Sequence, residues 1–397
     1  MLSEPKNKKR SKLKNNPENP TFGPDSSAEG EPSPYFDEVT ISEEMYSSNG
    51  KRSFSLWLTP QTVPSALLSE QRTGRGSYLP IDQLRSPESN DVQRINKEYE
   101  EEVVIGEAKK VGLRVVNRDA TGGTIGFMAP WSTSAETENV RGVVEALALL
   151  YPDQKIVLIE TPGMGASESL TKDDEKELKD GSFAPMADQI AATLKEAGYQ
   201  FNVLFGVSEG ARVVTSLSSL LEVPVCVTVD PPGTDKQSIL KFGKRFMIDE
   251  GAFQAKVKKV SPDAKMVESQ SIDQKIGTKE IMKGLGDNQL MSKAVAMSRD
   301  KYLEDVEKSI NSGTVHYDFR ASDSTIASHE KCISFASKHD GYYAIVLNGA
   351  KHAVVEMNPF ATALLLSQAL DIHRSEESDQ SIPIAKRLVE NDLKPTV

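Results

Sequence analysis

Residues 201–221 constrain the fold of this chain more than any other segment. An apolar run, Phe-Asn-Val-Leu-Phe, has the composition of a buried strand and ends at Gly206. Apolar side chains then recur at helical spacing from Val213 to Leu221. Because few residues separate these two patterns, the chain must turn sharply near Ser208. The segment predicts a strand, a tight turn and an amphipathic helix.

The turn carries the pattern G-x-S-x-G, formed by Gly206, Ser208 and Gly210. A serine on such a turn is held in a strained backbone conformation that lifts its hydroxyl above the sheet edge. The residues two before and two after it crowd together, so both must be small. The helix start also directs backbone N–H groups and the positive end of its dipole to this place. The pattern indicates a nucleophilic serine, although the same letters occur in ordinary turns.

Strand and helix patterns alternate from about residue 110 to residue 373, apart from one polar, lysine-rich insertion. This alternation predicts an α/β fold with a mostly parallel, doubly wound sheet and helices on both faces. In such a sheet the active residues collect in loops at the carboxyl ends of the strands. Expected strands include 124–128, 155–159, 223–229, 314–319 and 342–347, and expected helices include 136–150, 186–197 and 359–373.

Composition divides the chain further. Residues 1–50 are rich in Pro, Ser, Asn, Lys and Glu and hold few aliphatic side chains, so we expect a disordered tail. Residues 51–100 are expected to form a partly ordered N-terminal extension. Residues 101–233 and 313–397 are expected to form the α/β core, which the insertion 234–312 interrupts.

Charge and cysteine content narrow the functional class. A net charge of −11 argues against a nucleic-acid-binding protein. No run approaches 18 apolar residues, so no membrane span is expected. No apolar region follows the first charged residues, so no secretory signal is expected. Cys226 and Cys332 lie in apolar, core-like contexts, so we expect free thiols in a cytoplasmic protein. The histidines and cysteines lack metal-ligand spacing, so no metal is expected.

A serine nucleophile needs a base, and the chain has five histidines, all after Ser208. Only His352 follows directly on a buried strand, which places it at the carboxyl edge of the sheet with Ser208. The base needs a carboxylate to fix its tautomer. Asp323 follows the strand 314–319 and is the expected acid, and Asp230, at the end of the preceding strand, is the alternative.

Three motifs together resemble the α/β-hydrolase superfamily, in the branch with a helical cap after strand six. They are the G-x-S-x-G turn at 206–210, the segment Glu-Thr-Pro-Gly-Met-Gly-Ala-Ser at 160–167, and Lys-His-Ala at 351–353 with Glu356 and Pro359 following. Two positions depart from the family pattern. Glu160 stands where an aspartate is usual, and Ala-Pro-Trp at 129–131 stands where His-Gly is usual.

The resemblance implies further roles. The backbone N–H groups of Trp131 and Glu209 would form the oxyanion hole, and the insertion 234–312 would be the cap that shapes the substrate pocket. Lys241, Lys244 and Arg245 contribute to a basic first half of this insertion. A solvated face is the expected explanation, and an acidic substrate or acyl-carrier partner is the alternative.

The sequence predicts a serine hydrolase that cleaves an ester, thioester or amide bond in a small acyl substrate without a cofactor. Ser208 would attack, His352 would transfer the proton, and Asp323 would orient His352. A cofactor-free peroxidase or a C–C bond hydrolase would use the same residues. A non-catalytic binding protein with the same fold is the alternative from another class. The sequence favours no particular oligomeric state.

Overall fold

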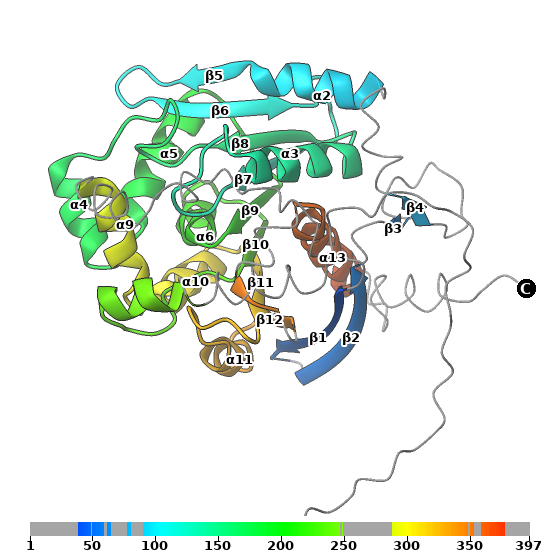
Figure 1. The fold of residues 1–397 in the computed structure, drawn as a ribbon, viewed down its shortest axis with the longest axis vertical. Helices are drawn as coiled ribbons and strands as arrows, with labels where there is room; N and C mark the ends of the chain where they lie inside the picture. Colours follow the sequence, from blue (N-terminus) through cyan, green and yellow to red (C-terminus); the bar gives the residue numbers. More distant parts are fainter. Residues whose placement is uncertain are drawn as a thin grey trace, which may run out of the picture. The chain divides into compact units, whose positions relative to one another are not determined.

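A ten-stranded sheet organises the described part of the chain (Figure 1). The computed structural model describes residues 39–48, 50–58, 62–64, 78–80, 90–246, 248, 288–347, 350–352 and 359–377. All of them belong to one compact unit, Ser33–Val397. In spatial order the strands are β2 (Gly50–Leu58), β1 (Val39–Ser47), β12 (Tyr342–Leu347), β11 (Val315–Ala321), β10 (Val225–Val229), β9 (Val203–Val207), β7 (Thr124–Met128), β8 (Lys155–Ile159), β6 (Val111–Val116) and β5 (Glu102–Ile105).

The centre of the sheet is parallel and its two margins are antiparallel. The strands β8, β7, β9, β10, β11 and β12 each run parallel to their neighbours in this group. At one margin β6 and β5 continue the sheet in antiparallel pairs, and at the other β1 and β2 do so. The predicted α/β class with a mostly parallel, doubly wound sheet is confirmed.

Both faces of the sheet are buried, which explains why its strands are continuous apolar runs. In β9, Val203, Phe205 and Val207 belong to one apolar cluster, whereas Leu204 belongs to another on the opposite face. The first face is covered by α2 (Asn90–Glu100), α3 (Glu138–Leu150) and α13 (Pro359–Glu377). The other face is covered by α4 (Lys172–Lys179), α5 (Ala184–Glu196), α6 (Glu209–Leu220), α10 (Tyr302–Asn311) and α11 (Glu330–Ala336).

Regular structure begins closer to the N-terminus than the sequence predicted. Residues 39–50 were included in the expected tail, but β1 pairs with β12 from Glu43 opposite Leu347 to Tyr46 opposite Ala344. The boundary at residue 50 is therefore wrong, because hydrogen bonds to the sheet edge order a segment that is poor in aliphatic side chains. Residues 1–38 lie outside the described residues. Within the extension, a separate two-stranded sheet joins β3 (Thr62–Pro64) to β4 (Tyr78–Pro80).

The insertion between β10 and β11 is shorter than the sequence predicted. Its last helix, α10, buries Tyr302 and Val306 against α6 and β11, so α10 belongs to the helical layer of the core and the boundary at 312 is too late. The other described parts of the insertion are the helical residues 239–246 and the helix α9 (Asn288–Met297), which packs on α4. Residues 249–287 lie outside the described residues.

Two further expectations concern single features. Both cysteines, Cys226 and Cys332, are buried free thiols, as expected. Among the described residues, no helix combines the length and the apolar character that a membrane crossing requires.

Candidate active site

Ser208 occupies the sharp turn between β9 and α6. Its backbone has φ 54° and ψ −115°, a conformation that residues with a side chain rarely adopt. The turn is held from both sides, because the Ser208 N–H donates to the carbonyl of Val229 at 2.9 Å and the Ser208 carbonyl accepts from Arg212 at 3.4 Å. The strained serine that the sequence predicted is therefore present at the carboxyl end of the sheet.

The two glycines of the motif are required by space. A Cβ atom on Gly206 would lie 2.5 Å from the carbonyl oxygen of Gly210. A Cβ atom on Gly210 would overlap the backbone carbonyls of Met128 and Ala129, where β7 ends. Backbone therefore packs directly against backbone at this turn. This packing leaves no room for a residue larger than glycine at either position.

His352 connects Ser208 to a carboxylate. Its Nε2 lies 3.0 Å from Ser208 Oγ, and its Nδ1 lies 2.6 Å from Asp230 Oδ2. An ionised carboxylate only accepts hydrogen bonds, so Nδ1 carries the proton and Nε2 can accept the hydrogen bond of the serine hydroxyl. Ser208, His352 and Asp230 are all buried. The arrangement places a hydroxyl, an imidazole and a carboxylate in the order that a catalytic triad requires.

The carboxylate beside His352 is not the one that the sequence favoured. Asp323 is exposed, and its carboxylate accepts a hydrogen bond from the neighbouring Ser322 hydroxyl at 3.0 Å. Its backbone N–H donates to the carbonyl of Ala350, so the Asp323 loop borders the His352 loop without presenting its acid to the ring. The expectation of Asp323 is corrected in favour of the alternative, Asp230.

Asp230 is fixed by its own backbone and by β11. The residue has a positive φ of 43°, and its N–H donates to the carbonyl of Phe319 at 2.7 Å. Its Oδ1 accepts from the N–H of Ala321 at 3.2 Å and lies 3.9 Å from Nε of the buried Arg320. Burial alone would raise the pKa of Asp230, but the hydrogen bond with His352 and the Arg320 charge lower it below its usual value. The carboxylate is therefore ionised at neutral pH.

Arg320 is a functional neighbour that the sequence analysis missed. It lies on β11 and donates to the carbonyl of Pro231 at 2.8 Å, and its Nη1 lies 3.6 Å from Asp318 Oδ1. An arginine in a strand of a parallel sheet was the available signal, because a fully buried guanidinium requires carboxylate partners.

The expected oxyanion donors lie near the serine. Glu209 is the first residue of α6, so its backbone N–H has no acceptor within the helix. Trp131 lies in the loop after β7, and the carbonyls at the end of β7, at 128 and 129, pack against Gly210. The ring of Trp131 meets that of Phe246 edge-on, and Phe246 in turn meets the ring of His352, with centroids 6.1 and 6.0 Å apart. The roles of the two N–H groups remain predictions.

Glu160, the departure from the family pattern, holds two loops together. Its carboxylate accepts from the N–H of Ala166 at 2.9 Å and from that of Ala135 at 3.2 Å. The Ser167 hydroxyl donates to the Glu160 carbonyl at 2.8 Å. Burial raises the pKa of Glu160 and these backbone donors oppose the change. The longer glutamate side chain is therefore used to join the loops after β7 and β8.

A buried ion pair lies directly behind the serine. Lys293 of α9 places its Nζ 3.1 Å from Glu209 Oε1, and each side chain is only 1% exposed. The same ammonium group donates to the Thr161 hydroxyl at 2.9 Å. Burial raises the pKa of Glu209, and the Lys293 charge opposes this shift. The sequence analysis did not identify Lys293, which is one lysine in a lysine-rich insertion.

Comparisons with known proteins give similarity at the level of structure only. No family model and no curated protein matches the chain. A bromoperoxidase from Bacillus anthracis matches 67% of this chain and 99% of its own, at 15% identity and a TM-score of 0.46. A serine hydrolase from the polyaromatic hydrocarbon-degrading bacterium Cycloclasticus zankles matches 68% and 98%, at 14% identity and a TM-score of 0.47. A thermophilic esterase from Thermogutta terrifontis matches 68% and 98%, at 13% identity and a TM-score of 0.43.

A mostly parallel sheet with helices on both faces carries a strained serine on the turn from β9 into α6. Serine, acid and histidine follow one another along the chain and meet at the carboxyl edge of the sheet. The chain has the α/β-hydrolase fold.

Proposed function

We propose that the protein is a serine hydrolase that cleaves an ester, thioester or amide bond through an acyl-enzyme. The observation that carries this proposal is the pair of contacts around His352, 3.0 Å to Ser208 Oγ and 2.6 Å to Asp230 Oδ2. Both distances lie within hydrogen-bond reach, which a base and its orienting acid require.

The reaction would proceed in two halves. Ser208 Oγ attacks the carbonyl carbon while its proton passes to His352 Nε2, and Asp230 stabilises the imidazolium. The backbone N–H groups of Glu209 and Trp131 would bind the oxyanion. The imidazolium then protonates the leaving group, which departs and leaves an ester on Ser208. A water molecule, deprotonated by His352, releases the acid and restores the serine.

Labelling with a fluorophosphonate tests the proposal, because this probe reacts with activated serines. We expect labelling of the native protein and none of Ser208→Ala. We also expect hydrolysis of p-nitrophenyl acetate that falls by several orders of magnitude in Ser208→Ala while circular dichroism is unchanged. Equal hydrolysis by the two proteins, without labelling, would refute the proposal and favour a binding protein with this fold.

A further inference from the structure

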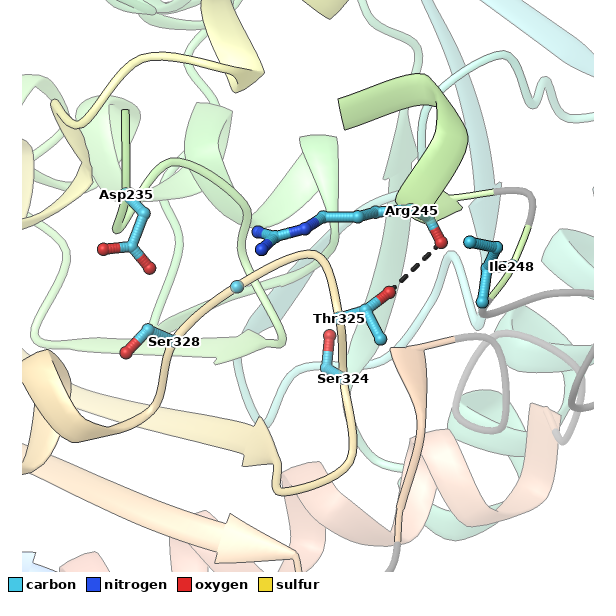
Figure 2. Close-up of a pocket in the computed structure, with 7 residues that line it drawn as sticks. Asp235, Arg245, Ile248, Ser324, Thr325 and Ser328 are labelled. Atoms are coloured by element: carbon cyan, nitrogen blue, oxygen red, sulfur yellow. Dashed lines mark hydrogen bonds between the residues drawn. The ribbon is translucent and has the colours of Figure 1, made fainter. Parts of the chain in front are cut away.

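A cavity of about 340 Å³ lies between the helical residues 239–246 and the loop after β11 (Figure 2). Its volume falls within the range of roughly 300–1,000 Å³ that is usual for small-molecule sites. Five of its seven lining residues are polar, and Ile248 and Ala327 are apolar. The polar lining residues are Asp235, Arg245, Ser324, Thr325 and Ser328.

The cavity adjoins the candidate triad through two of its walls. Ser324, which lines it, makes a side-chain hydrogen bond with Asp230. On the other wall, Arg245 is followed by Phe246, whose ring meets His352 edge-on. Ser324 and Phe246 therefore connect the walls of the cavity to the acid and the base of the triad, neither of which lines the cavity itself.

Arg245 supplies a cation without a carboxylate partner in the described part of the chain. Its guanidinium extends into the cavity (Figure 2). Its Nη1 donates to the neutral amide oxygen of Gln237 at 3.1 Å. A guanidinium has five N–H donors in a planar fork, so most remain available to a ligand. The helix that carries Arg245 is tied to the loop, because the Thr325 hydroxyl donates to the Arg245 carbonyl at 3.1 Å.

The acids around the cavity already have partners. Asp235 lies 2.8 Å from the ammonium group of Lys331. The hydroxyl of Ser328, which lines the cavity, donates a hydrogen bond to the carboxylate of Glu330. Asp230 behind Ser324 is paired with His352 and faces Arg320. Among the residues that line the cavity, Arg245 is the charged one without an oppositely charged partner within the described ranges, so an anion would bind at its guanidinium group.

We propose that this cavity is a substrate subsite in which Arg245 binds a carboxylate, so that the substrate is an acyl compound with a second, ionised acid group. A carboxylate matches the planar fork of a guanidinium and can accept two parallel hydrogen bonds from it. The inference rests on the proposed hydrolase function. Ligand binding is assigned to Arg245 and not to Lys241 or Lys244 of the same helix, because these two lysines are exposed on a solvated face.

The test compares anionic with neutral esters. p-Nitrophenyl hydrogen succinate carries a carboxylate on its acyl part, 4-acetoxybenzoate carries one on its leaving group, and p-nitrophenyl butyrate and phenyl acetate are their neutral counterparts. The measured quantity is the ratio of kcat/KM for an anionic ester to that for its neutral counterpart. Loss of a charged hydrogen bond is worth about 1.5–3 kcal/mol, or roughly 10- to 150-fold. We expect Arg245→Gln to lower one of the two ratios by such a factor, mainly through KM, and Arg245→Lys to restore part of it.

Lys244→Gln is the matched control, because it removes one positive charge from the same helix at an exposed position. We expect it to leave both ratios unchanged within about twofold. Unchanged ratios in Arg245→Gln, or equal losses in Arg245→Gln and Lys244→Gln, would overturn the subsite.

A binding measurement keeps this inference separate from the proposed function. Succinate and monomethyl succinate should raise the Tm of Ser208→Ala, which cannot form an acyl-enzyme, and Arg245→Gln in that background should abolish the rise. Absence of any esterase activity with this Tm pattern intact would refute the hydrolase and retain the subsite. Esterase activity with unchanged kcat/KM ratios and without the Tm pattern would refute the subsite and retain the hydrolase.

Discussion

Replacement of Asp230 by asparagine tests which carboxylate orients His352. In the structure Oδ2 accepts the His352 Nδ1 proton at 2.6 Å, while Oδ1 accepts from the N–H of Ala321 at 3.2 Å. An amide has the same shape, but one of its two ends is a donor. If Oδ1 remains the acceptor for Ala321, the NH₂ group faces Nδ1 and selects the tautomer whose proton lies on Nε2. That tautomer has no acceptor for the Ser208 hydroxyl.

The expected loss in turnover is large. In serine-protease triads this change lowers kcat by about 10⁴, which corresponds to about 5.4 kcal/mol at 1.36 kcal/mol per tenfold. The assay is p-nitrophenyl acetate hydrolysis under saturating conditions, together with the rate of fluorophosphonate labelling. Because the amide still fills the same space, we expect an unfolding free energy only about 1–3 kcal/mol lower.

Asp323→Asn is the control, because its carboxylate is exposed and contacts only the Ser322 hydroxyl among the described residues. We expect turnover within about twofold of the parent. A severe loss in Asp323→Asn, with near-normal turnover in Asp230→Asn, would refute the assignment of the acid.

The remaining predictions concern stability and accessibility. Gly210→Ala should lower the unfolding free energy by about 1–3 kcal/mol or more in urea titrations, because the new methyl group overlaps backbone carbonyls. Lys293→Met should cost about 3–5 kcal/mol by leaving Glu209 buried without its cation, and adding Glu209→Gln should recover at least half of that loss. The buried Cys226 and Cys332, whose thiol pKa burial raises (to about 12 for Cys332), should react with a disulfide reagent only after unfolding.

The acid limb of the stability curve gives a further prediction for Asp230. Its pKa lies below the usual 3.8, so the ionised form stabilises the folded state at every pH above the usual value. This contribution is lost as pH falls through the lowered pKa of the folded state. Parental protein should therefore lose stability more steeply below about pH 4 than Asp230→Asn does. Parallel pH profiles in chemical denaturation would contradict the shift.

Much of the sheet could be predicted from local sequence. The strands 124–128, 155–159 and 342–347 were predicted with the bounds that the structure has, since a strand buried on both faces is a short, continuous apolar run. β1 and α10 were assigned to the tail and the insertion. Their order depends on partners far along the chain, β12 for the strand and α6 for the helix, which local patterns do not contain.

The acid shows the same limit at the scale of one residue. Asp230 and Asp323 both follow a parallel strand at the same edge, and both lie between the serine and the histidine in the chain. The difference arises from the loops. Asp230 directly follows β10 in a left-handed conformation tied to Phe319, whereas Asp323 lies beyond the end of β11 and faces solvent. Loop paths of this kind depend on tertiary hydrogen bonds, so the sequence could only name both candidates.

Lys293 shows why the inserted helix α9 and the serine turn must be considered together. A lysine in a lysine-rich insertion is expected in solvent, yet this one is buried against Glu209, the residue next to Ser208. If α9 left the core, Glu209 would keep a buried charge without its partner, and breaking such a pair costs about 3–5 kcal/mol. Gln289, on the same helix, adds a hydrogen bond to the carbonyl of Pro162. A movement of α9 out of the core would therefore disturb the backbone that carries Ser208. A movement of the segment 239–246 would break the ring contacts of Phe246 with His352 and Trp131. It would also break the hydrogen bonds of Arg245 with Thr325 and Gln237, but no buried ion pair among the residues that the structure describes. This segment is therefore the energetically easier route to the buried serine.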